Sequence, residues 1–95
     1  MTLEELRIKV NECNKELFQV LKKRFDVTRE IGELKAKTNL PACDKKRQEE
    51  ILEKVKKEAK MFSLNGDMVE KIFKTIMKQV VKEHKEIRNA NRKNK

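Results

Sequence analysis

The segment LEELRIKVNECNKELFQVLKKRFDVTREIGELKAK, residues 3–37, decides the fold of this 95-residue chain. Apolar residues recur along it in alternating steps of three and four, at Leu3, Leu6, Val10, Cys13, Leu17, Val20, Val27, Ile31 and Leu34. This spacing is typical of a helix that packs along its whole length against another helix. It predicts one helix about 50 Å long, at about 1.5 Å per residue. Because ordinary globular helices are far shorter, much of this apolar seam needs cover from outside its own neighbourhood.

Arg24 occupies the one position of the seam where an apolar residue is due but absent. Burying an unpaired charge costs on the order of several kcal/mol, and no Asp or Glu interrupts the same seam to pair with it. Arg24 is therefore expected to be either a paired structural residue or a ligand for an anion. The simplest alternative is an arginine that extends from the edge of the seam into water.

Lys35 lies eleven residues after Arg24. That separation is three helical turns plus about 20°, so both cations project from nearly one face, about 16 Å apart. Thr28 and Ile31 lie between them. A glycine in mid-helix, such as Gly32, lowers the stability of the helix by about 1 kcal/mol relative to alanine. Its presence suggests that a ligand or another helix approaches the backbone closely there. The spacing leaves room for a small anionic molecule.

Arg7 lies on the same face as Lys35 but about 42 Å away along a straight helix. If Arg7 serves the same small anion, it must come from a second copy of the chain. A core built by only 95 residues is marginal, which also favours burial between subunits. The sequence therefore predicts a homodimer with shared sites.

Two further helices are expected after the long one. Pro41 disfavours continuation of the first helix, and Asp44 is a natural N-cap for a second. This second helix should stop near Ser63, and a third should begin at about Asp67. We predict an all-α single domain, residues 1–95, with one very long N-terminal helix, one short and one medium, in a homodimer.

Residues 3–87 form the expected ordered core, and residues 88–95 a basic polar tail that is expected to fray. The low content of Gly (2) and Pro (1) and the absence of Trp and Tyr agree with an all-helical chain.

The net charge of +9 raises the question of nucleic-acid binding. The basic residues are dispersed among acids, however, and no aromatic-basic platform is present to stack bases. No apolar segment has the length of a membrane span, and the acids Glu4 and Glu5 stand where a signal peptide would be basic. Cys13 and Cys43 match no metal spacing, and reduced thiols are the simplest assignment. We expect a cytoplasmic protein without nucleic-acid or membrane partners.

Two further groups of residues are candidates for the site. Asp44, Arg47 and Gln48 share the first turn of the second helix, where a cap plus ordinary surface charge is the simplest interpretation. The alternative is that this turn brings a cation and two hydrogen-bonding groups to the cleft beside Arg24. His84 continues an apolar line on the third helix, where a histidine is usually a satisfied core residue but could also donate to a ligand.

Taken together, these residues resemble the all-helical class of chorismate mutase, an intertwined homodimer of three-helix chains. The matching elements are Leu6-Arg7, Lys23-Arg24, Ile31-Gly32-Glu33-Leu34-Lys35 and the stretch from Pro41 to Arg47. The resemblance covers roughly residues 3 to 87, and its specificity lies in the joint order and spacing of these elements.

The resemblance implies binding of chorismate and its Claisen rearrangement to prephenate, on the way to phenylalanine and tyrosine. By position, Arg24 and Arg7 of the partner subunit would bind the two carboxylates, and Lys35 would reach the ether oxygen and a carboxylate. Arg47 would add positive charge, while Asp44 and Gln48 would hold the ring hydroxyl. The implied catalytic residues are Arg24, Lys35 and His84, and no cofactor or metal is expected.

Three positions depart from the usual pattern of this family. Gln48 stands where glutamate is common, Val80 replaces a small polar residue, and His84 replaces a glutamine that helps to donate to the ether oxygen. Activity is therefore expected to fall as the histidine loses its proton.

Three alternatives stay open at this point. The scaffold also resembles isochorismate-pyruvate lyase. The alternating three–four spacing and the net positive charge also fit a non-enzymatic dimerisation or nucleic-acid-binding module. The chain could also be one portion of a longer multifunctional enzyme.

Overall fold

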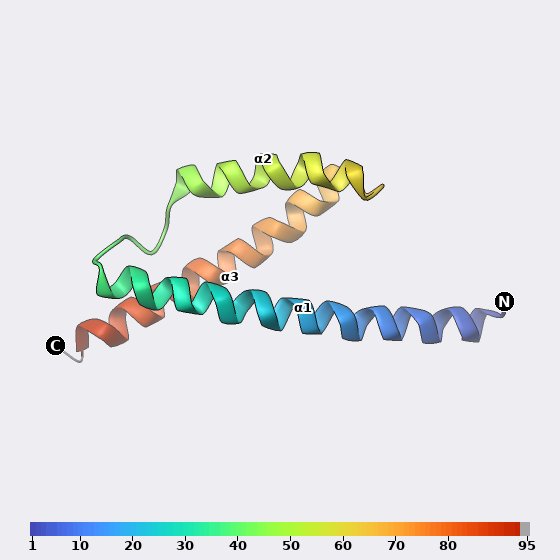
Figure 1. Ribbon diagram of the computed structural model, residues 1–95, viewed down its shortest axis with the longest axis horizontal. Helices are drawn as coiled ribbons and strands as arrows, with labels where there is room; N and C mark the ends of the chain where they lie inside the picture. Colours follow the sequence, from blue (N-terminus) through green and yellow to red (C-terminus); the bar gives the residue numbers. More distant parts are fainter. Residues whose placement is uncertain (94–95) are drawn as a thin grey trace.

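The computed structural model describes residues 1–93 and contains three helices, α1 (Leu3–Lys37), α2 (Lys45–Met61) and α3 (Gly66–Lys93). The prediction of an all-α chain with a very long N-terminal helix is confirmed. In Figure 1, α3 runs diagonally from the end of α2 to the C-terminal half of α1. The result is an elongated molecule that measures 60 × 26 × 14 Å.

Side-chain caps explain where α1 and α2 begin. The Thr2 side chain accepts a hydrogen bond from the Glu5 backbone N–H at 3.2 Å, and the Asp44 Oδ1 accepts one from the Arg47 N–H at 3.0 Å. Each cap satisfies a backbone donor that the first turn of a helix leaves without a partner. The predicted N-cap at Asp44 is confirmed.

The connections are short, and their residues adopt conformations that a helix cannot. Asn39 has a positive φ of 58° just after the end of α1, and Ser63 has a φ of 57° between α2 and α3. Asn65 then caps α3, since its Oδ1 accepts from the Met68 N–H at 3.0 Å. Consequently α3 begins at Gly66, one residue before the predicted start at Asp67.

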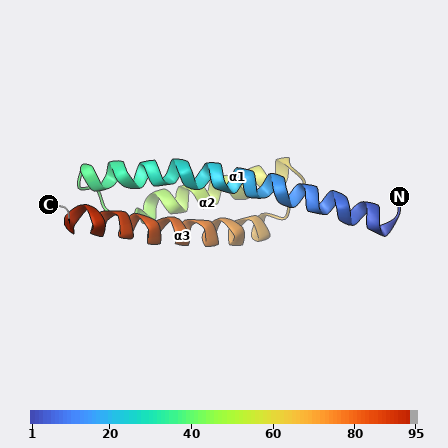
Figure 2. The same cartoon turned by 90° about the horizontal axis from the view of Figure 1, so that it is seen from below.

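The third helix packs against both of the others, whereas α1 and α2 do not approach each other closely. Figure 2 shows α1 and α3 lying side by side. A small core lies between α2 and α3, and it consists of Val55, Ala59 and Val69 with Ile51 and Phe73 packed against them.

Gly32 is the only buried residue of α1, and side chains of α3 lie directly against it. A Cβ atom at this position would lie 2.6 Å from Cδ2 of His84 and 3.0 Å from Cδ1 of Ile87. The predicted close approach to Gly32 is confirmed, and helix packing supplies it.

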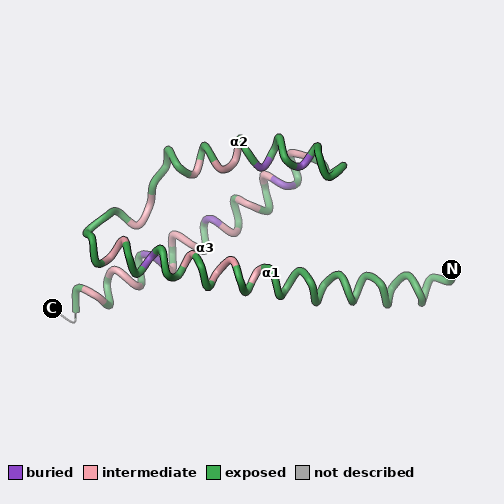
Figure 3. The backbone as a smooth tube through the Cα atoms, viewed as in Figure 1, coloured by how far each residue is buried: buried purple, intermediate pink, exposed green. Residues whose placement is uncertain are grey.

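The apolar seam of α1 is uncovered in the single chain. Every residue from 1 to 20 is exposed, and Figure 3 shows this part of α1 projecting beyond the other helices. Exposed fractions along the seam run from 43% at Ile31 to 62% at Leu3 and Val20. A continuous apolar surface of this length is typical of an interaction surface.

Residues 88–93, which belong to the predicted basic polar tail, continue α3 in the structure. The Asn91 side chain donates to the Ala36 carbonyl at 3.3 Å, and Arg88 donates to the Leu40 carbonyl at 3.4 Å. These bonds join the last turns of α3 to the end of α1 and to the connection that follows it. Residues 94 and 95 lie outside the described residues.

Charged side chains also join α2 to α3. The Lys56 ammonium lies 3.1 Å from a Glu70 carboxylate oxygen and 3.5 Å from Asp67. Hydrogen bonds from Lys74 and Lys56 lower the pKa of Glu70 below its ordinary value. Among the described residues, no helix combines the length and apolar character needed to cross a bilayer.

Substituting Gly32→Ala should destabilise the fold, because the new methyl group would overlap the His84 ring. Overpacking of this kind costs about 1–3 kcal/mol, which outweighs the gain of about 1 kcal/mol in helix propensity. Chemical denaturation followed by circular dichroism measures the difference.

Gly66→Ala is the matched control, since a Cβ there meets its nearest atom, the Lys56 carbonyl oxygen, at an ordinary 3.5 Å. The double variant Gly32→Ala with His84→Ala should recover stability relative to Gly32→Ala alone. Equal stability of Gly32→Ala and wild type would contradict the described contact.

Candidate functional site

Arg24 lies on the part of α1 that faces α3. Its guanidinium carbon is 5.7 Å from the centroid of the Phe73 ring, within the range of about 6 Å in which a cation is attracted to an aromatic face. Its Nη1 atom is buried, yet it has no hydrogen-bond partner among the described residues. A buried, charged donor without an acceptor is costly, so Arg24 is suited to bind an anion.

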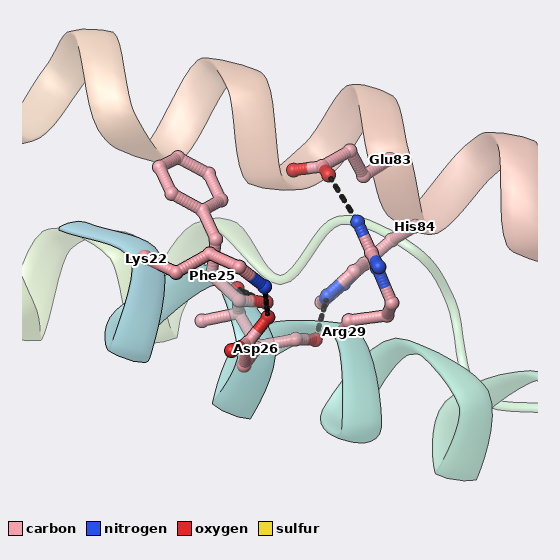
Figure 4. Close-up of polar contacts among 7 residues, drawn as sticks. Lys22, Phe25, Asp26, Arg29, Glu83 and His84 are labelled. Carbon is pink, nitrogen blue, oxygen red and sulfur yellow. Dashed lines mark hydrogen bonds and ion pairs between the residues drawn. The ribbon is translucent and has the colours of Figure 1, made fainter. Parts of the chain in front are cut away.

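His84 is 4% exposed and lies against the backbone of α1. Its Nε2 atom is 2.7 Å from the carbonyl oxygen of Thr28, as the dashed line from His84 in Figure 4 shows. Because a carbonyl oxygen only accepts, Nε2 must carry the hydrogen and donate it. His84 therefore fills the core position that its place on the apolar line predicted.

The other ring nitrogen of His84, Nδ1, is buried and has no hydrogen-bond partner within residues 1–93. In a neutral ring whose Nε2 carries the hydrogen, Nδ1 has only a lone pair and can only accept. Protonation of the ring turns Nδ1 into a donor. His84 can therefore donate to a ligand only in its charged form.

Figure 4 also shows the surroundings of this contact. Arg29, one residue after Thr28, pairs with Glu83 across the two helices at 3.7 Å. On the same stretch of α1, Lys22 forms a hydrogen bond with Asp26. Arg29 and Lys22 thus have charged partners, whereas within residues 1–93 the Nη1 atom of Arg24 has none.

The predicted site residues at the start of α2 are less buried than His84. Asp44 uses one carboxylate oxygen for the helix cap. The Arg47 guanidinium is exposed and lies 3.7 Å from Glu50. Gln48 and, near the end of α1, Lys35 are half-buried.

A hollow of about 1100 Å³ opens between the three helices. Its apolar wall includes Phe25, Leu52, Met77 and Val81, and Gln48 contributes an amide. Gln48 is the one predicted site residue that lines it. The predicted cations Arg7, Arg24, Lys35 and Arg47 do not line this hollow, and neither does Asp44.

Two predicted residues lie elsewhere. Val80 is half-buried on α3, one turn before His84. Arg7 is exposed on the half of α1 that projects beyond the other helices. The single chain thus brings His84 to α1 and Arg24 to Phe73, but it does not gather all of the predicted cations.

Three contributions to this region were not predicted as site features. Phe73 supports the guanidinium of Arg24, the Thr28 carbonyl fixes the ring of His84, and Val81 lines the hollow. Phe73 and Val81 are apolar residues of the predicted third helix, so the sequence marks their position but not their role. A backbone carbonyl has no sequence signal at all.

Comparison with known proteins agrees with this arrangement. Residues 6–85 match the family described as chorismate mutase type II. The chain is 31% identical over 87 residues to a bifunctional chorismate mutase/prephenate dehydratase of Buchnera aphidicola subsp. Schizaphis graminum, which covers 92% of this chain and 23% of that protein. It is 29% identical over 77 residues to a T-protein of Enterobacter agglomerans, which covers 81% of this chain and 21% of that protein.

A second bifunctional chorismate mutase/prephenate dehydratase, from Aquifex aeolicus, is 38% identical over 53 residues, 56% of this chain and 15% of that protein. The chain thus spans less than a quarter of the length of these curated relatives. The family match takes in parts of all three helices and every predicted site residue. This chain therefore belongs to the chorismate mutase type II family, a family of isomerase domains.

Proposed function

We propose that this domain rearranges chorismate to prephenate in the cytoplasm, as a step in aromatic amino acid biosynthesis. The family membership supports the reaction. The single structural observation that carries the proposal is the buried Nη1 of Arg24, a charged donor without a partner on the face between α1 and α3. A substrate carboxylate is the acceptor that this donor requires.

The reaction needs no nucleophile and no general base, because one C–C bond forms while one C–O bond breaks within a single molecule. Catalysis then depends on holding the flexible substrate in its bent, reactive conformation. Arg24 is suited to this task, since contact with the Phe73 ring limits the orientation of its guanidinium plane. An oriented guanidinium can bind a carboxylate through two parallel hydrogen bonds.

Negative charge grows on the ether oxygen as the C–O bond breaks. Positioned cationic donors stabilise that charge more in the transition state than in the substrate. We assign this role to Lys35 and to the protonated ring of His84, whose Nδ1 then becomes a donor. Arg47 adds to the positive field, and Asp44 and Gln48 hold the ring hydroxyl.

The proposed enzyme is an intertwined homodimer. The uncovered seam of α1 supports this, because residues 1–20 have no cover within their own chain. Arg7 lies in that segment, too far along α1 to reach a site at Lys35 of the same chain. In the dimer, Arg7 of the partner subunit binds a carboxylate of the substrate at each site.

Removing either arginine should impair catalysis. In Arg24→Ala and in Arg7→Ala, kcat/KM for chorismate should fall about 100-fold or more, since a lost charge-assisted contact costs about 3 kcal/mol. Formation of prephenate from chorismate measures this. Arg29→Ala is the matched control on the same helix, where an exposed ion pair with Glu83 is lost, and its kcat/KM should change less than about threefold.

Mixing the two inactive variants tests whether sites are shared. A dimer of one Arg24→Ala chain and one Arg7→Ala chain has one site that lacks both arginines and one that lacks neither. Activity should therefore rise after subunit exchange toward one quarter of the wild-type value per chain. Exchange demonstrated by mass spectrometry without any recovery would refute shared sites.

The rate should depend on pH through His84. Nδ1 donates only while the ring is protonated, so kcat/KM of the wild type should fall as pH rises. His84→Gln keeps an amide donor at every pH, and its profile should be flat. Parallel profiles for the two proteins would remove His84 from the donor role.

The choice between two reactions on this scaffold is tested with two substrates. We expect prephenate from chorismate and no turnover of isochorismate. Release of salicylate and pyruvate from isochorismate, with chorismate left unchanged, would assign the chain to isochorismate-pyruvate lyase instead. If neither acid is turned over while DNA or RNA binds with a steep salt dependence, the non-enzymatic alternative holds.

A further inference from the structure

A second hollow lies away from Arg24, between the α1–α2 connection and the C-terminal part of α3. It measures about 420 Å³ and is lined by Pro41, Ala42, Cys43, Lys85, Arg88, Asn89 and Arg92. We call it the C-terminal cation hollow. Its cations, Lys85, Arg88 and Arg92, all belong to α3.

The helix places these cations on one stripe. Lys85, Arg88 and Arg92 are separated by three and four residues, which are the spacings of neighbours on one helix face. Arg88 fixes the stripe against the connection, since Nη1 donates to the Leu40 carbonyl at 3.4 Å and Nη2 to Asn39 Oδ1 at 3.5 Å. The distance between the stripe and the connection is therefore set by the fold.

The charge of the hollow is not balanced. No carboxylate lines it, and within residues 1–93 no ion pair involves Lys85, Arg88 or Arg92. Like charges at such spacings on a helix repel each other. A bound anion would remove this repulsion.

We propose that the C-terminal cation hollow binds a small anion with at least two negative charges, a phosphate or a dicarboxylate, independently of the Arg24 site. Guanidinium groups bind both kinds of oxyanion through paired hydrogen bonds. The side chain of Asn89 adds an uncharged donor, and the volume lies in the range of about 300–1,000 Å³ that small ligands occupy.

Occupancy of this hollow would also affect the start of α2. Its wall includes Cys43, the residue before the cap Asp44, and the connection leads directly to Arg47 and Gln48. An anion held between α3 and the connection would restrain these residues. This consequence for catalysis rests on the proposed function, but binding itself does not.

Titration followed by amide NMR tests the proposal without any assay of activity. Inorganic phosphate and malonate are added separately to the full chain at constant ionic strength, with sodium chloride as the reference. The amide chemical shifts of residues 42–43 and 85–92 are expected to change and to reach saturation. Response to phosphate alone identifies a phosphate site, and response to malonate alone identifies a carboxylate site.

Variants that remove charge distinguish anion binding in this hollow from binding elsewhere on the chain. Lys85→Gln with Arg92→Gln should weaken binding at least tenfold, and it leaves the Arg88 anchor intact. Lys60→Gln with Lys71→Gln removes the same charge from exposed positions outside the hollow and should bind as the wild type does. Arg24→Ala should also leave these shifts unchanged.

Three results would overturn the proposal. The first is a set of shifts that grow without saturation and match those caused by chloride. The second is equal weakening in the two charge-matched double variants. The third is loss of the shifts in Arg24→Ala, which would place the anion at the Arg24 site.

Discussion

An apolar seam that its own chain cannot cover is the constraint on which the rest of the structure depends. Only the C-terminal half of α1 packs on α3, and residues 1–20 are exposed throughout. A helix without tertiary contacts is marginal in water at this length, and its exposed leucines and valines favour association. A second copy is the cover that we propose, and the same association would bring Arg7 to a distant site.

The contact between Gly32 and His84 serves both packing and chemistry. Absence of a side chain at Gly32 lets the imidazole lie against the α1 backbone, and that position brings Nε2 to the Thr28 carbonyl. The hydrogen bond then determines which nitrogen carries the hydrogen in the neutral ring. A packing requirement at one glycine thus limits His84 to donating to a ligand only when charged.

Local signals explain what the sequence could predict. The three–four spacing and the cap at Asp44 placed the bounds of α1 and the start of α2, and Gly32 marked the closest approach of helices. Contacts between distant residues explain what was missed. The Asn91 side chain bonds to the Ala36 carbonyl, 55 residues away in sequence, and the contact of Arg24 with Phe73 depends on how α1 and α3 cross. Whether the predicted cations converge depends on a second chain, so it stays a prediction.

Arg24 and His84 also share a property that neither sequence pattern nor packing requires. Among the described residues, the buried side-chain nitrogens and oxygens without a hydrogen-bond partner belong to these two residues. Burying such atoms costs about 1–3 kcal/mol each, and more for a charged group, so folding alone would favour their replacement. Proteins commonly keep such costs at functional sites. A ligand that supplies one acceptor to Nη1 of Arg24 and another to Nδ1 of the protonated His84 ring would recover that free energy on binding. The same unpaired atoms would then weaken the free fold and stabilise the complex.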